Sequence, residues 1–438
     1  MSERPHPASK PSGLGVIFLT IFIDLLGFTI IFPLFPALLD YYLRVDGNHG
    51  IFGALVAGID YLGKHAGGTS DYREVLFGGI VISLYAFLQF YFSPLWGALS
   101  DRIGRRSVLR LTIAGTAVSY LLWFFSGSFL LFVASRLLAG AFAGNLSVAT
   151  AAVADVTTRE NRTKGMAIIG VAFGLGFLVG PAIGSLAAML DLTASHPHWS
   201  AFGVNPFSAA ALLSLVFSVT NLIWVNLRFH ETLDPQHREE AVRVRHPLHE
   251  LIASDNGPAR RTNWLYFIYQ LAFAGMESAL PFLANRRFGF GAVEMAKIFV
   301  FLGLVLLLTQ GAIVRRAVPR FGEKPVLLAG MAFILIGMLG LALAQSQSGL
   351  YAGLAALGIG SGLTNPSVSS LVSLYSTRQQ QGRMLGIFRS LGSLARGLGP
   401  LAACFIFWRF GPSAPFFIAA AVMLIPWFMA LPLPRPAK

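Results

Sequence analysis

Five ionisable side chains lie inside apolar stretches of the sequence, where each charge needs compensation. They are two carboxylates, Asp24 and Glu277, and three arginines, Arg136, Arg389 and Arg396. A charge at the centre of a bilayer costs about 2.5 to 3.5 kcal/mol on insertion scales, so such residues are expected to face a protein interior or a water-filled cavity. A carboxylate in a poorly solvated cavity favours its protonated form, which a proton carrier requires. An arginine offers a planar fork to a carboxylate or phosphate.

These residue types predict proton and anion chemistry. We predict that Asp24 and Glu277, which each lie in the opening helix of one half of the chain, bind a coupling proton or orient the groups that do. Three arginines against two acids favour an amphipathic, anionic substrate, with Arg389 as its main partner and Arg136 and Arg396 as further contacts. The alternative is that all five charges only pair to hold helices together. Uncharged polar and aromatic residues are expected to complete the pocket: Phe28, Gln89, Asn145, Gln310 and Asn365.

Apolar helices must position these side chains. Hydrophobic residues make up 55% of the chain and charged residues only 12%, a composition typical of an integral membrane protein. Apolar stretches long enough to span about 30 Å of hydrocarbon as helices recur throughout. We predict twelve spans, near 14–38, 76–98, 107–126, 129–152, 164–190, 206–227, 264–284, 293–313, 324–344, 348–374, 384–408 and 413–432.

The loops between these spans differ in charge. The net charge is +13, and the basic residues lie mostly in alternate loops, whereas the other loops are short and nearly uncharged, apart from 39–75 and 285–292. This positive-inside pattern predicts a multi-pass cell-membrane protein with both termini in the cytoplasm, and it argues against nucleic-acid binding. The short outer loops, without usable glycosylation sequons, favour a bacterial inner membrane.

The chain contains an internal repeat. "RIGRRSVL" from Arg102 and "RFGEKPVL" from Arg320 lie 218 residues apart, and "NLSV" from Asn145 and "NPSV" from Asn365 lie 220 apart. A shared offset predicts two parallel six-helix halves. We place the N-terminal bundle at 1–227, a cytoplasmic linker at 228–263 and the C-terminal bundle at 264–438.

Two such halves resemble the major facilitator superfamily. "GALSDRIGRRSVL", from Gly97 to Leu109, is similar to its signature loop between helices two and three, and "SRLLAGAFAGN" is similar to its arginine-bearing motif. The resemblance implies an all-α membrane fold of two pseudo-symmetric six-helix bundles. In this loop Asp101 is expected to face a neighbouring helix N-terminus, and the arginines are expected to pair with Asp155 or Glu160. The expected gating residues of this region are Gly97, Asp101, Arg102, Gly104, Arg105, Arg106, Asp155 and Glu160.

A narrower resemblance covers nearly the whole chain. "GVAFGLGFLVGPAIG" looks like the glycine-proline motif of drug–proton antiporters, in which Gly176, Gly180 and Pro181 would let helices approach closely. With "GNLSVATAAVADV" and "FRSLGSLARGLGP" it is similar to the tetracycline-transporter-like branch, which implies efflux of drugs or organic anions. We therefore predict a monomeric proton antiporter that exports amphipathic compounds by alternating access, and no enzyme.

Other functions remain open alternatives: proton-coupled uptake of a metabolite by symport, lipid translocation, or ligand sensing without transport. No cofactor is expected, because "GIDYLGKH" at 58–65 has histidine where a phosphate-binding loop needs serine or threonine. No metal is expected either, because "HPLHE" at 246–250 lies in a charged linker.

Overall fold

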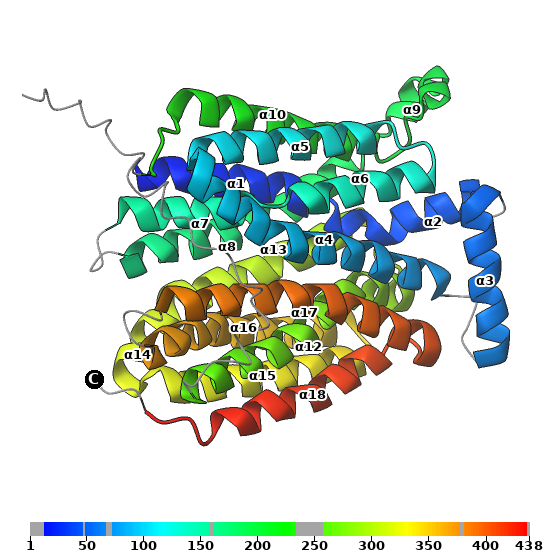
Figure 1. Ribbon diagram of the computed structural model, residues 1–438. Coiled ribbons are helices and arrows are strands. Elements are labelled where there is room, and N and C mark those ends of the chain that lie inside the picture. Colours follow the sequence, from blue (N-terminus) through cyan, green and yellow to red (C-terminus); the bar gives the residue numbers. More distant parts are fainter. Residues whose placement is uncertain are drawn as a thin grey trace, which may run out of the picture.

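The computed structural model describes residues 13–46, 49–66, 72–157, 162–233, 257–376 and 381–435, and the regular elements of these ranges are helices (Figure 1). The N-terminal part contains α1 (Leu14–Thr29), η1 (Phe32–Leu34), α2 (Phe35–Asp46), α3 (Gly50–Ala66), α4 (Arg73–Ile103), α5 (Arg105–Phe124), α6 (Phe129–Phe142), α7 (Asn145–Val156), α8 (Arg162–Ala187), α9 (Leu192–Ser195), η3 (Pro197–Phe202) and α10 (Ser208–Arg228). The C-terminal part contains α12 (Gly257–Phe288), α13 (Ala292–Leu308), the π-helical η5 (Thr309–Val314), α14 (Arg315–Phe321), α15 (Glu323–Leu343), α16 (Gln347–Tyr375), α17 (Gln381–Phe410) and α18 (Ala414–Ala430).

The outer surface of these helices is apolar. Ten helical stretches in the described ranges are long and apolar enough to cross a membrane. The two other predicted spans form α16, which is rich in glycine, serine and asparagine, and α18, which has 17 residues. Large apolar side chains are exposed along the outside of the bundle, among them Val216 and Ile223 on α10, Ile336 on α15 and Phe428 on α18. Such a surface is suited to lipid.

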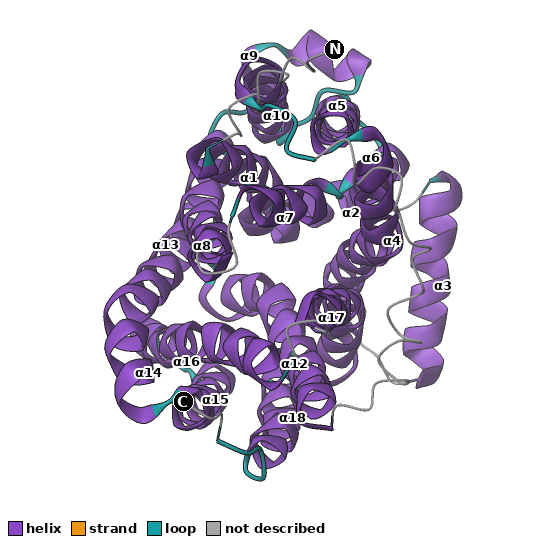
Figure 2. Cartoon of the chain, turned by 60° about the vertical axis from the view of Figure 1, so that its left-hand side comes forward, coloured by secondary structure: helices purple, strands orange, loops and turns teal. Residues whose placement is uncertain are grey.

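The helices form two groups that lie side by side. Figure 1 shows α1 to α10 in blue to green on one side and α12 to α18 in light green to red on the other. Helix α4 packs against α17, and α8 packs against α13, and Figure 2 shows α8 beside α13 from a second direction. Helix α10 ends at Arg228, and α12 begins at Gly257, within the predicted linker 228–263. The domain limits at 227 and 264 stay predictions.

The structure corrects the expected first outer loop. We expected 39–75 to be a long loop, but helix α2 continues to Asp46 and α3 follows. Helix α3 lies outside the bundle, across the end where α2 finishes and α4 starts (Figure 1). Phe52 of α3 is buried and stacks on Phe129, with 4.0 Å between the ring centroids. An ion pair between Asp60 and Arg73 joins α3 to α4.

The fourth predicted span is also interrupted. The predicted span 129–152 breaks into α6 and α7 at Ala143 and Gly144. A Cβ on Gly144 would lie 2.6 Å from Trp96, and the Trp96 indole donates to the Ala141 carbonyl at 2.7 Å. The close approach of α4 therefore requires glycine at this position and leaves Asn145 at the start of α7.

Candidate functional site

One cavity of about 990 Å³ lies between the two groups of helices. This central cavity has a size typical of sites for drug-sized ligands. Its lining reaches Asp101 and Arg105, where α4 ends and α5 begins, which we call the Arg105 end. At the opposite end of the bundle, the Glu74 end, the lining stops at Phe35, Val81 and Pro281.

All ten side chains that we predicted for proton and substrate binding line this central cavity: Asp24, Phe28, Gln89, Arg136, Asn145, Glu277, Gln310, Asn365, Arg389 and Arg396. Their positions agree with a shared chamber, while their individual roles stay predictions. Gln310 belongs to the π-helical turn η5. Such turns occur frequently at functional sites, and this one extends a helix that otherwise has α geometry on both sides.

Asp24 contacts the start of α7, which follows the break in the fourth predicted span. The Asn145 amide donates to the Asp24 carboxylate at 2.7 Å, and Asn145 is the first residue of α7. A carboxylate near a helix N-terminus is favoured by the helix dipole. The acid on α1 therefore has a partner on α7, within the N-terminal group of helices.

Arg136 is buried among aromatic rings. Its guanidinium carbon lies 4.7 Å from the Trp123 ring centroid and within 6 Å of those of Tyr120 and Phe132, at 5.8 and 5.7 Å. Nε donates to Ser135 at 3.2 Å, and Nη2 is buried without a hydrogen-bond partner. Cation–π contacts of this kind compensate part of the cost of desolvation.

The C-terminal group contributes a second set of charges. The positive charge of Arg396 acts on Glu277, and Arg396 donates to Ser393 at 3.0 Å. Arg389 lies on the same helix and is exposed to the cavity that it lines. Tyr266 stacks on Phe388 with 3.7 Å between the centroids, and the charges of both arginines act on its hydroxyl. One carboxylate and two guanidiniums thus face the cavity from α12 and α17.

Tyr85 is a cavity residue that the sequence analysis missed. It lies on α4, lines the cavity and stacks on Phe28 with 5.2 Å between the centroids. The charges of Asp24, Arg136 and Arg396 all act on its hydroxyl. Tyr85 therefore lies between the charged groups of the two halves, but a tyrosine in a phenylalanine-rich span carries no signal of this position.

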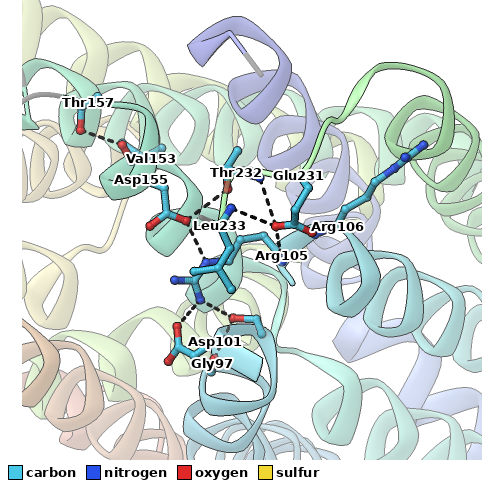
Figure 3. Close-up of polar contacts among 11 residues, drawn as sticks. Gly97, Asp101, Arg105, Arg106, Val153, Asp155, Thr157, Glu231, Thr232 and Leu233 are labelled. Carbon is cyan, nitrogen blue, oxygen red and sulfur yellow. Dashed lines mark hydrogen bonds and ion pairs between the residues drawn. The ribbon is translucent and has the colours of Figure 1, made fainter. Parts of the chain in front are cut away.

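A polar cluster forms at the Arg105 end (Figure 3). Arg105 is buried and pairs with both Asp101 and Asp155, and its Nε lies 2.9 Å from Asp155 Oδ2. The expected pairing with Asp155 is therefore present. Asp101 was expected to face a helix N-terminus, and its carboxylate pairs with the side chain of Arg105, the first residue of α5, across the helix break at Gly104. Glu160 and the 246–250 segment lie outside the described residues.

Glu231 is the group that caps helix α5. Its carboxylate accepts hydrogen bonds from the backbone N–H groups of Arg105 at 2.8 Å and Arg106 at 3.2 Å, as Figure 3 shows. Thr232 donates to Asp155 at 3.2 Å, and Arg106 donates to the Asn226 carbonyl at 2.6 Å. The segment after α10 is therefore part of this cluster, whereas Arg102 is exposed.

The Glu74 end is closed by contacts between the halves. Arg286 on α12 pairs with Glu74 on α4, with Nε 2.9 Å from Oε1, and its guanidinium lies over the Tyr72 ring. Gly78 packs directly against Phe282, because an added Cβ would lie 2.7 Å from that ring. We call this set of contacts the Glu74–Arg286 clamp.

The glycine-proline motif packs α8 against α1. A Cβ on Gly176 would lie 2.6 Å from Leu25, and one on Gly180 would lie 1.8 Å from Thr29. Thr29 also donates to the Gly176 carbonyl at 3.0 Å. Pro181 lies within α8. The close packing agrees with the expectation from the motif, and a role in gating stays a prediction.

Comparisons with known proteins agree with this architecture. The Major Facilitator Superfamily model matches residues 17–320 and 312–438. Major facilitator superfamily domain-containing protein 10 of Mus musculus is 34% identical over 461 residues, with 99% of this chain and 96% of that protein covered. Tetracycline resistance protein, class B, of Escherichia coli is 27% identical, with 90% and 88% covered.

Solved structures show the same fold. The crystal structure of the human organic anion transporter MFSD10 (TETRAN) has a TM-score of 0.75 and 34% identity, and it covers 95% of this chain and 98% of that chain. The D-xylose-proton symporter has a TM-score of 0.74 at 16% identity, with 97% and 98% covered, which shows the fold alone.

The relatives do not support a bacterial inner membrane. The proteins at 34 to 35% identity come from mouse, cattle and human, whereas the bacterial tetracycline resistance proteins are 26 to 28% identical. Short outer loops are therefore a poor indicator of the host membrane. The family match and the full-length relatives nevertheless agree on the class: the chain belongs to the Major Facilitator Superfamily and is a multi-pass membrane transporter rather than an enzyme.

Proposed function

We propose that this protein exports amphipathic organic anions by proton antiport and alternating access. The observation that carries the proposal is the central cavity itself. Besides Asp101 and Arg105 at the Arg105 end, one largely apolar chamber between the two groups of helices is lined by the carboxylates of Asp24 and Glu277 and the guanidiniums of Arg136, Arg389 and Arg396. Intramembrane charges of this kind are expected at substrate and proton pathways.

The proton would bind to Asp24 in one half and Glu277 in the other. Asp24 accepts a hydrogen bond from Asn145, and Glu277 lies in the field of Arg396. Because protonation removes the charge of either acid, it changes the electrostatic balance that the neighbouring arginines and a bound anion experience. This change links protonation of the two acids to binding of the anion, and we propose that the linkage couples the proton flux to the anion flux.

An anionic substrate with an apolar body fits the lining of the cavity. Arg389 and Arg396 supply positive charge from α17, and aromatic side chains such as Phe28, Phe32 and Phe177 supply apolar surface. The relatives include an organic anion transporter and tetracycline resistance proteins, which supports this substrate class. We propose that the protein works as a monomer, with the lipid bilayer around its apolar exterior.

We propose that the Arg105 end and both termini face the cytoplasm, because the basic loops follow the positive-inside pattern. The cavity lining reaches that end, while the Glu74–Arg286 clamp closes the other. In this orientation the described conformation is open to the cytoplasm, the state in which an exporter loads its substrate.

Flux in proteoliposomes of known orientation tests the proposal. With a fluorescent amphipathic anion such as 1-pyrenebutyrate, a proton gradient directed into the cytoplasmic side should drive the anion out through the opposite side. Accumulation of the anion in the same direction as protons would establish symport and refute antiport. Movement of labelled lipid without a gradient, or binding without flux, would refute the proposed function.

A further inference from the structure

Arg136 is a buried cavity residue whose charge no carboxylate neutralises among the described residues. Only 6% of the residue is exposed, yet it lines the central cavity. Among the residues that the structure describes, no carboxylate pairs with it, and its buried Nη2 has no hydrogen-bond partner. A guanidinium in such a site calls for an anion, because a buried donor without a partner is costly.

Asp24, an acid in the N-terminal half, has another hydrogen-bond partner. Asp24 and Arg136 both act on the Tyr85 hydroxyl, so they share one region of the cavity, but the Asp24 carboxylate is bound by Asn145. Ser135 supplies only a neutral oxygen to Nε. The rings of Trp123, Tyr120 and Phe132 hold the guanidinium in place without neutralising it.

The geometry points to a binding subsite in which Arg136 takes the carboxylate of an amphipathic substrate, while the apolar body lies against the aromatic wall of the cavity. This inference rests on the proposed function and deepens it by naming the group that the N-terminal half recognises. Three aromatic rings lie within 6 Å of the guanidinium carbon and restrict its movement before the ligand arrives. A guanidinium held in this way favours a carboxylate, whose oxygens accept strong charge-assisted hydrogen bonds from N–H groups.

The subsite gives the N-terminal half its own hold on the anion, separate from Arg389 on α17. A substrate that contacts both halves can stabilise a state in which the two halves lie closer together, as an alternating-access cycle requires. Lysine would be a poor replacement, because a point charge keeps the attraction but loses the fork and the ring stacking.

Binding of a matched pair of probes tests this subsite. We would measure 1-pyrenebutyrate and its neutral amide on purified protein in lipid nanodiscs, for the wild type, Arg136→Gln and Arg136→Lys. Arg136→Gln should weaken binding of the carboxylate by about tenfold to hundredfold and leave the amide unchanged. Arg136→Lys should give an intermediate loss for the carboxylate. Arg110→Gln, which removes an exposed arginine on α5, should change neither probe.

The outcomes separate a ligand site from a structural role. If Arg136→Gln weakens the carboxylate and the amide equally, or weakens neither, the subsite is refuted. A wild type that does not prefer the carboxylate also refutes it. If the preference and its loss appear as expected but proton-driven flux is absent, the subsite stands and the proposed antiport fails.

Discussion

Breaking the Glu74–Arg286 clamp should open the end of the cavity that the structure shows closed. Glu74→Gln removes the charge of a carboxylate whose side chain is only 8% exposed, whereas its partner Arg286 is 40% exposed. Hydrogen bonds to charged groups contribute about 1.5 to 3 kcal/mol. The exposure of the arginine screens the pair, so we expect about 1 to 2 kcal/mol to be lost from the closed state. That loss raises the open population by about 5- to 30-fold.

A cysteine reporter measures this shift. The chain has a single cysteine, so Cys404→Ala gives a background without thiols, and Leu39→Cys then places one thiol at a buried position beside Gly78. Its rate of modification by a membrane-impermeant maleimide should rise by about 5- to 30-fold in Glu74→Gln. The charge-reversed pair Glu74→Arg with Arg286→Glu should restore slow labelling.

A matched control is the Asp40–Arg44 ion pair, whose side chains are 55% and 73% exposed. Arg44→Gln removes this pair but keeps Asp40, whose charge acts on Glu74, and it should leave the labelling rate unchanged. If Glu74→Gln also leaves the rate unchanged, packing of Gly78 against Phe282 alone closes this end, and our assignment of the clamp is wrong.

Three further substitutions test individual contacts. Gly180→Ala should destabilise the protein by about 1 to 3 kcal/mol through overpacking, because the new Cβ meets Thr29, whereas Gly170→Ala has open space and should be neutral in thermal unfolding. Asp155→Asn should cost about 1 to 3 kcal/mol of stability, because it removes one charged partner of the buried Arg105. Arg102→Gln changes an exposed arginine and is the control. Equal melting temperatures for the two variants would contradict the role of the cluster in stability. Phe52→Ala should release α3 at a cost of about 3 to 5 kcal/mol, seen as faster hydrogen exchange confined to α3, and exposed Leu55→Ala should not.

Much of the fold could be predicted from hydropathy and charge. The apolar stretches matched helices because a span in lipid must satisfy its backbone groups internally. The intramembrane charges pointed to one cavity for the same reason, since lipid does not solvate them. The glycine spacing in α8 predicted a close helix contact because only a missing Cβ allows it, and Gly180 shows the effect most clearly.

Features set by tertiary contacts were not predictable in this way. The break before Asn145 depends on the contact of Trp96 with Gly144, and neither residue by itself predicts a helix end. Glu231 caps α5 from a position 126 residues later in the chain, and it looked like an ordinary linker acid. Tyr85 and the clamp at Glu74 depend on which helices of the two halves meet, information that a single hydropathy pattern lacks.

The central claim is that the acids in the shared cavity carry the coupling proton, and paired flux assays on Asp24→Asn and Glu277→Gln test it most directly. Each variant should still exchange labelled for unlabelled anion across liposomes at equal pH, because that step needs no net proton movement. Each should lose accumulation of the anion when a pH gradient is applied. Full gradient-driven accumulation in both variants would contradict the account.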